Sequence, residues 1–148
     1  IKNIAELKDG ATVSIPHDPV NTGRALVLLH EAGLIKLKDP GNTLATQRDI
    51  VENPKHLKIR ELEGALLARS VSQVDLAFVF ANYALEAGID TNSALIVEKG
   101  KSLYIEFLVA RPDNINDPGL RKLAKALNSD EVRHFILTRY KGQIAPGF

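Results

Sequence analysis

The sequence predicts an α/β fold in which a mainly parallel sheet is flanked by helices. Short apolar runs alternate with helical patterns along most of the 148 residues, as they do in chains built from β-α-β units. The run at 74–80 is almost entirely apolar, which is typical of a parallel strand buried on both faces. A clear helix start at Asp18-Pro19 directly follows a strand pattern, as expected for a helical crossover.

The first elements are a short helix, a strand and a long helix. Asn3 can cap the short helix, and residues 11–15 form a strand that Pro16 closes. The long helix has Asp18 as its cap and Pro19 as its first residue, where the missing N–H costs no hydrogen bond. Its apolar face, which is expected to pack on the sheet, consists of Ala25, Leu28, Leu29 and Ala32.

The rest of the chain continues the alternation after a connecting segment at 38–54. Thr46 and Asp49 resemble a capping box at the start of a short helix within that segment. Two helices, beginning at Asp117-Pro118 and at Ser129, finish the chain. The other expected elements are strands at 57–62, 74–80 and 104–110 and helices at 64–70 and 82–88.

Composition and charge exclude several classes of function. Nineteen Lys and Arg against eighteen Asp and Glu give a formal net charge of +1, so no strong field draws the chain to nucleic acid. Without cysteine there is no thiolate nucleophile, disulfide or cysteine-based metal site. The four histidines are scattered, and no nucleophile elbow or Gly-rich phosphate loop occurs. We therefore expect no catalytic residue, no metal site and no cofactor.

Polar side chains crowd the junction between the strand at 11–15 and the long helix. Ligands of open α/β sheets bind beyond the carboxyl ends of the strands, and helix N-termini favour anionic groups. Asn21 and Arg24 lie three residues apart on one helix face and together can hold a carboxylate. In the alternative interpretation Arg24 pairs with an Asp or Glu, and Asn21 is an ordinary residue of the first turn.

The junction after the run at 74–80 has the same geometry and carries Asn82. Asn82 either caps the following helix, which Gly88 closes, or offers its amide donor and acceptor to a small polar ligand. Two such junctions in one sheet can meet at one cleft.

Several segments in the same order resemble the NlpA-type methionine-binding lipoproteins of bacterial methionine ABC importers. The likeness runs essentially from end to end, which makes it far more specific than any single motif. The matching segments are residues 1–10, 15–26, 29–38, 49–55, 82–88, 129–132 and 140–142.

The resemblance implies an extracytoplasmic solute-binding protein with the two-lobed, type II periplasmic-binding-protein fold and no enzymatic activity. It implies a lipid anchor on the outer face of the cell membrane and an ABC permease as partner. The expected ligand is L-methionine or a closely related amino acid or short peptide. Its head group is expected against Asn21, Arg24 and Asn82.

Within this fold, residues 3–99 are expected to form the second lobe. Residues 100–148 then supply a crossover strand and two C-terminal helices that return to the first lobe. The N-terminal portion of the first lobe, with its lipid-bearing cysteine, is expected to lie outside this chain. An exposed apolar face on the two helices is then expected to favour self-association, and it consists of Leu120, Leu123, Leu127, Phe135 and Ile136.

Three positions depart from the family pattern. His17 stands where asparagine is common, Phe80 replaces a polar residue ahead of Asn82, and Glu106 stands where the family often has asparagine. Effector-binding domains of transcription regulators share the two-lobed architecture, and such a domain is the alternative function.

Overall fold

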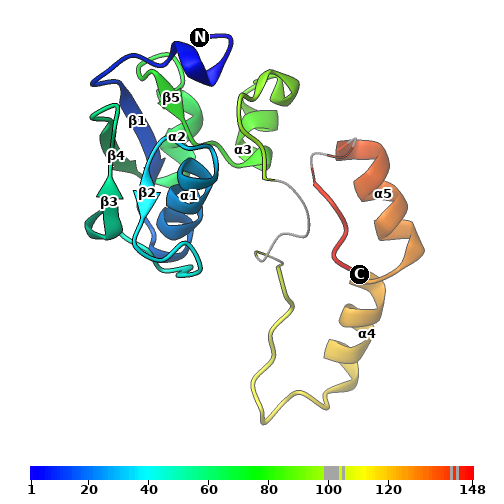
Figure 1. The fold of residues 1–148 in the computed structure, drawn as a ribbon. Helices are drawn as coiled ribbons and strands as arrows, with labels where there is room; N and C mark the ends of the chain where they lie inside the picture. Colours follow the sequence, from blue (N-terminus) through cyan, green and yellow to red (C-terminus); the bar gives the residue numbers. More distant parts are fainter. Residues whose placement is uncertain (99–103, 105, 141, 143) are drawn as a thin grey trace. The chain divides into compact units, whose positions relative to one another are not determined.

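The computed structural model describes residues 1–98, 104, 106–140, 142 and 144–148. The chain divides into two compact units, Ile1–Glu98 and Lys99–Phe148, and each unit is described by itself (Figure 1). The boundary predicted between residues 99 and 100 lies outside the described residues, so the assignment of the two lobes stays a prediction.

The first unit is built on a three-stranded parallel sheet with the order β4-β1-β5. The central strand β1 (Thr12–Pro16) pairs over its whole length with β4 (Lys58–Leu62). It pairs at only two positions with β5 (Leu76–Ala77). The predicted α/β class with a parallel sheet is confirmed.

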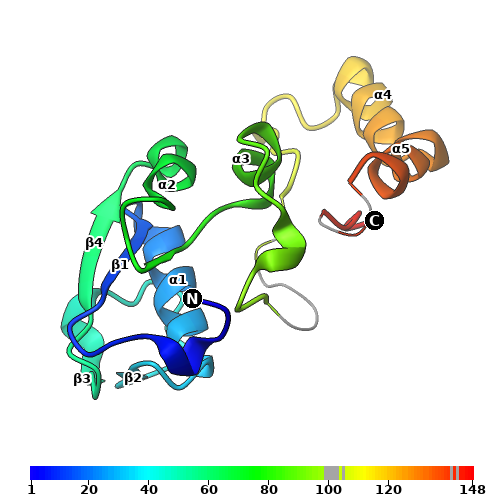
Figure 2. The ribbon, with the colours of Figure 1, turned by 90° about the horizontal axis from the view of Figure 1, so that it is seen from above.

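A helix follows each strand of this sheet. These helices are α1 (Pro19–Glu31), α2 (Gly64–Ser70) and α3 (Ala81–Glu86). Both α1 and α2 contact β1, and α1 runs beside that strand (Figure 2). Because helices contact it and strands pair along both of its edges, β1 is the most enclosed strand, and its Ile15 is completely buried. Between β1 and the end of α2, the Ser70 hydroxyl donates to the carbonyl oxygen of Leu67 and lies 2.8 Å from the buried Ser14 hydroxyl, with which it forms a second hydrogen bond.

The long helix begins as its local sequence predicts. Asp18 caps α1 by accepting a hydrogen bond from the backbone N–H of Asn21 at 3.0 Å, and Pro19 is the first helical residue. Gly33 follows the helix with a φ of 71°, in the left-handed region that favours glycine. Ala25 and Leu29 of the predicted apolar face are buried in the core, and Leu28 and Ala32 are half-buried.

The segment 38–54, predicted as merely connecting, contains the strand β3 (Ile50–Glu52), which pairs antiparallel with β2 (Lys36–Leu37) directly before the segment. This pair has little signal in the sequence because the strands are very short and the register shifts between Lys36 and Leu37. Between them, the predicted capping box at Thr46 and Asp49 is confirmed. It begins a single turn of 3-10 helix, Gln47–Asp49.

The capping box makes one component of the stability of this segment dependent on pH. The Thr46 backbone N–H and then the Thr46 hydroxyl, at 2.7 and 2.9 Å, donate to the Asp49 carboxylate and hold the pKa of Asp49 below its ordinary value. This contribution to stability is complete above the unfolded-state pKa and is lost as the pH falls through the lower folded-state value. In chemical unfolding curves, Asp49→Asn is expected to be less stable than the wild type near neutral pH, with the difference shrinking in acid. A difference that stays constant down to acidic pH would contradict this account.

Three predicted elements are wrong in extent. The short first helix, expected to extend to Asp9-Gly10, is a single 3-10 turn, Ile4–Glu6, although Asn3 does cap it. The strand predicted at 74–80 reduces to β5, whose residues are half-buried, because β5 is an edge strand with one neighbour. No strand is found at 104 and 106–110, where Phe107 and Val109 are exposed, while position 105 lies outside the described residues.

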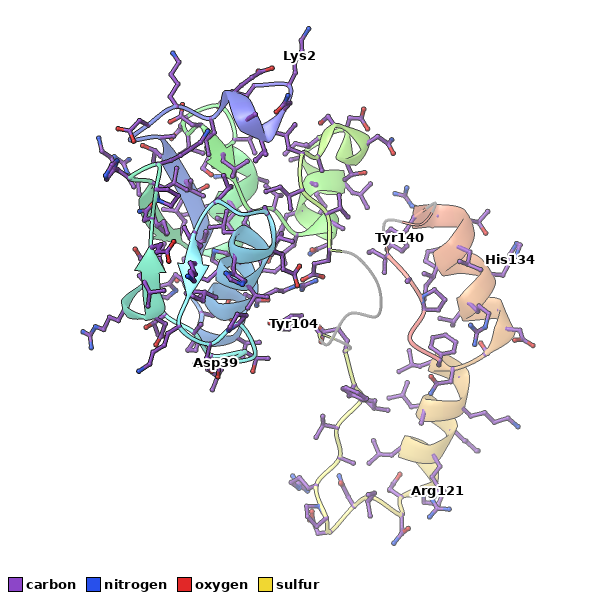
Figure 3. All side chains as sticks on the ribbon, in the orientation of Figure 1. Lys2, Asp39, Tyr104, Arg121, His134 and Tyr140 are labelled. Atoms are coloured by element: carbon purple, nitrogen blue, oxygen red, sulfur yellow. The ribbon has the colours of Figure 1, made fainter. Side chains whose placement is uncertain are left out.

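In the second unit, the two predicted helices are α4 (Pro118–Leu127) and α5 (Asp130–Tyr140). Asp117 caps α4, and the Ser129 hydroxyl accepts a hydrogen bond from the backbone N–H of Val132 in α5 at 3.3 Å. Figure 3 shows their side chains, with Arg121 on α4 and His134 on α5 labelled. None of the described residues after position 103 is buried. Among the described helices, none has the length and apolar character needed to cross a membrane.

Candidate functional site

The carboxyl edge of the parallel sheet positions the candidate site. β1 ends at Pro16 and is followed by α1, β4 ends two residues before α2, and β5 ends four residues before α3. Three helices therefore begin beyond the carboxyl ends of strands in a single sheet. Backbone N–H groups at helix N-termini point outward at such an edge and favour polar or anionic ligands.

Asn21 lies in the first turn of α1 and is held by the cap residue. Its side-chain amide donates to both carboxylate oxygens of Asp18, at 3.0 and 3.1 Å. One N–H of the amide is thus shared between the two carboxylate oxygens of the cap, and the second N–H and the carbonyl oxygen are the groups of Asn21 suited to a ligand. Asn21 is half-buried at the carboxyl edge of the sheet.

Arg24, one turn further along α1, forms a two-pronged ion pair with Glu98. Its Nε donates to Oε1 and its Nη2 to Oε2 of Glu98, each at 2.6 Å. Only 23% of the Arg24 side chain and 29% of the Glu98 side chain is exposed. Pairing of Arg24 with an acidic residue, one of the two sequence-based alternatives, is therefore what the structure shows. Its role toward a ligand carboxylate stays a prediction.

Asn82 does not cap α3, so that prediction is wrong. Phe80 occupies the cap position with an extended backbone, and Asn82 is the second residue of the helix. The Asn82 side chain is exposed, and within the described part of the chain no hydrogen bond to it is found. Its amide is therefore presented to solvent at the beginning of α3, and its contact with a ligand stays a prediction.

An aromatic cluster that the sequence did not predict surrounds the beginning of α3. The rings of Phe78 and Phe80 meet edge to face with centroids 5.2 Å apart, and Tyr83 packs on Phe80 at 6.1 Å. A Cβ placed on Gly64, at the start of α2, would lie 3.4 Å from Phe80. The cluster therefore joins the N-terminal ends of α2 and α3, and Phe80, one of the three departures from the family pattern, lies at its centre.

A shallow cavity of about 340 Å³ lies beside the N-terminal end of α1. His17 on its rim lies 3.4 Å from Glu63, and Glu61 accepts a hydrogen bond from the side chain of Gln47 at 2.6 Å. The lining residues are His17, Pro19, Thr22, Ala45, Thr46, Arg48 and Glu61. Across the described residues, no three His, Cys, Asp or Glu side chains are grouped so that they could hold a metal ion.

Glu98 is the member of the site that sequence reasoning missed. Arg24 and Glu98 are 74 residues apart, so no helical spacing connects them. The available signal was an acidic residue directly after the apolar run at 94–97, near the end of the predicted second lobe. Glu106, the departure noted further along, is exposed and belongs to the second unit.

Comparison with known proteins gives a family for the whole chain. The family model described as NlpA lipoprotein matches residues 1–148. The probable D-methionine-binding lipoprotein MetQ of Pasteurella multocida is 43% identical over 100% of this chain and 54% of its own length. The D-methionine-binding lipoprotein MetQ of Salmonella typhi is 46% identical over 100% of this chain and 56% of its own length. The chain thus spans about half the length of these curated relatives.

Solved structures agree with the sequence comparison. A nutrient-binding protein from Burkholderia cenocepacia bound to methionine matches with a TM-score of 0.93 and 40% identity, over 100% of this chain and 63% of its own. A crystal structure of the methionine-binding protein MetQ matches with a TM-score of 0.90 and 39% identity, over 100% and 62%. The predicted resemblance and the periplasmic-binding-protein fold are confirmed, and the family consists of binding proteins rather than enzymes. The chain therefore belongs to the NlpA lipoprotein family of substrate-binding proteins.

Proposed function

We propose that this chain forms part of an extracytoplasmic protein that captures L-methionine, or a closely related amino acid, for an ABC importer. Residues 3–99 act as the second lobe, and residues 100–148 return to a first lobe that is supplied by further sequence. A lipid anchor holds the whole protein at the outer face of the cell membrane. The methionine-binding relatives and the solved structure with bound methionine support this proposal.

The observation that carries the proposal is the pairing of Arg24. Its side chain is about three-quarters buried, and its guanidinium already holds one carboxylate with two short hydrogen bonds. A site that binds the Glu98 carboxylate in this way has the geometry required to bind an amino-acid carboxylate. Asn21, on the same face of α1, and Asn82, at the start of α3, supply further polar contacts to the head group.

Closure of the two lobes on the ligand makes the loaded protein different in conformation from the empty one. A ligand that contacts both lobes stabilises the closed arrangement more than the open one and so shifts the population between them. The importer then distinguishes loaded from empty protein by this difference in arrangement. The transport step itself requires no covalent chemistry from these side chains.

The 148-residue chain alone is expected to bind L-methionine at least about 100-fold more weakly than the chain joined to its first lobe. A small ligand loses most of its surface to solvent only when both walls of the cleft are present. Calorimetric titration of both proteins measures this difference. Equal affinity of the two would show that the first lobe is dispensable and would contradict the proposed interlobe site.

The chain alone is also expected to self-associate through α4 and α5. Leu123, Leu127 and Phe135 are 45, 44 and 58% exposed, whereas Leu120 and Ile136 of the predicted face are half-buried. A second copy of the chain can cover this apolar surface, which would otherwise remain in water. Sedimentation velocity at increasing concentration is expected to show association that Leu123→Gln with Phe135→Gln reduces. A wild-type chain that stays monomeric at high concentration would contradict the expectation.

A further inference from the structure

The charge balance of the Arg24–Glu98 pair restricts what can bind to it. Arg24 uses its Nε and Nη2 on both oxygens of Glu98, so the pair as a whole carries no net charge. Both side chains are more than two-thirds buried, so solvent replaces a lost partner poorly. Both residues belong to the first compact unit, Ile1–Glu98.

A ligand carboxylate that takes the Arg24 guanidinium displaces Glu98 or approaches it closely. Glu98 then loses its cation and faces a second negative charge in a half-buried place, which is unfavourable. A ligand with only a carboxylate leaves Glu98 without a cation and beside a second negative charge. A ligand that also carries a positive group next to its carboxylate removes this cost, because its positive group pairs with Glu98 in place of Arg24.

We infer that Arg24 and Glu98 together form a receptor for the zwitterionic head group of a free α-amino acid. Arg24 binds the α-carboxylate and Glu98 binds the α-ammonium. In an α-amino acid these two groups are attached to the same carbon, so they lie as close together as the partners of the observed ion pair. The inference rests on the proposed function and adds Glu98 as a residue that determines specificity.

The same reasoning separates a free amino acid from a short peptide. In a dipeptide the ammonium and the terminal carboxylate belong to different residues and are separated by the peptide bond. A dipeptide therefore cannot place its carboxylate on Arg24 and its ammonium on Glu98 at the same time. The pair selects free amino acids over peptides, over carboxylic acids and over amines.

The test compares three ligands in the whole, two-lobed protein by calorimetric titration. They are L-methionine, its analogue without the amino group, 4-(methylthio)butanoate, and its analogue with an alcohol in place of the carboxylate, methioninol. The wild type is expected to bind L-methionine at least about 100-fold more tightly than either analogue. Glu98→Gln is expected to weaken L-methionine at least about 10-fold and to leave 4-(methylthio)butanoate unchanged or tighter, so that the preference for the amino group collapses.

Two further variants make the outcome decisive. Glu86→Gln removes an exposed carboxylate from α3 and is expected to leave all three affinities within a few-fold of wild type. Arg24→Ala is expected to weaken L-methionine and 4-(methylthio)butanoate while changing methioninol much less. Retained binding of 4-(methylthio)butanoate by Glu98→Gln also shows that this variant is folded.

The inference is overturned, and the proposed function is not, if Glu98→Gln keeps the wild-type ratio between the affinities for L-methionine and for 4-(methylthio)butanoate. It is likewise overturned if Glu98→Gln binds L-methionine more tightly, since Glu98 would then be only an internal competitor for Arg24. A wild-type protein that binds no free amino acid overturns the proposed function and this inference together.

Discussion

Arg24→Ala is expected to weaken the binding of L-methionine by more than about 100-fold in the whole two-lobed protein. Hydrogen bonds to a charged group contribute roughly 1.5–3 kcal/mol each, and about 1.4 kcal/mol corresponds to a tenfold change in affinity. The variant loses both bonds that a guanidinium fork makes to a carboxylate, and it leaves the partly buried Glu98 without its cation. Calorimetric titration of the folded variant measures the effect.

Two variants control this experiment. Arg24→Lys is expected to recover only part of the affinity, because an ammonium cannot reproduce the two parallel hydrogen bonds of the fork. Arg69 in α2 is exposed and has no ion pair within the described residues, so Arg69→Ala is expected to stay within a few-fold of wild type. Wild-type affinity of Arg24→Ala together with a lower free energy of unfolding would instead identify the Arg24–Glu98 pair as purely structural.

Gly23→Ala is expected to lower the free energy of unfolding by about 3 kcal/mol or more. Gly23 lies in α1 where the loop at 43–45 crosses the helix, and a Cβ at this position would lie 2.1 Å from the carbonyl oxygen of Thr43 and 2.7 Å from its carbonyl carbon. These atoms belong to the backbone, so no rotation of a side chain relieves the overlap. Ala45, in the same loop, is completely buried, so the loop cannot shift without opening the core.

Gly64→Ala is the matched control because it makes the same chemical change at another helical glycine. The nearest atoms to a Cβ there belong to the Phe80 and Tyr83 rings, at 3.4 and 3.5 Å, and can adjust. Since alanine is the better helix former, this variant is expected to change stability by less than about 1 kcal/mol in either direction. Denaturant unfolding of both variants gives the comparison, and a Gly23→Ala effect as small as that of Gly64→Ala would refute the steric explanation.

Elements whose signals are local could be predicted from the sequence. Asp18-Pro19, Asp117-Pro118 and Ser129 begin helices where predicted, because a cap and a proline act on the neighbouring backbone alone. The parallel sheet was also predictable, since each strand is followed by a helical crossover. These features depend on residues within one turn or one strand of each other.

Features that depend on distant partners could not be predicted. The apolar run at 74–80 has the composition of a central strand, but its place at the sheet edge leaves only Leu76–Ala77 paired. Asn82 has a favourable capping side chain, yet Phe80 holds the cap position because the aromatic cluster fixes the chain two residues earlier. For the same reason Asn21 and Arg24 were found as candidates while Glu98 was not, since its position depends on the fold.

The central position of β1 also affects the order in which the chain can fold. β1 is synthesised before both of its partners, β4 and β5, which come much later in the sequence. Pairing between strands so distant along the chain is slow, whereas the β2–β3 pair closes a much shorter loop and can form early. Until β4 is made, Val13 and Ile15 have no sheet to bury them, so the nascent chain carries an aggregation-prone segment. A chaperone that covers β1 in the interval before β4 is made is therefore expected to suppress aggregation most effectively.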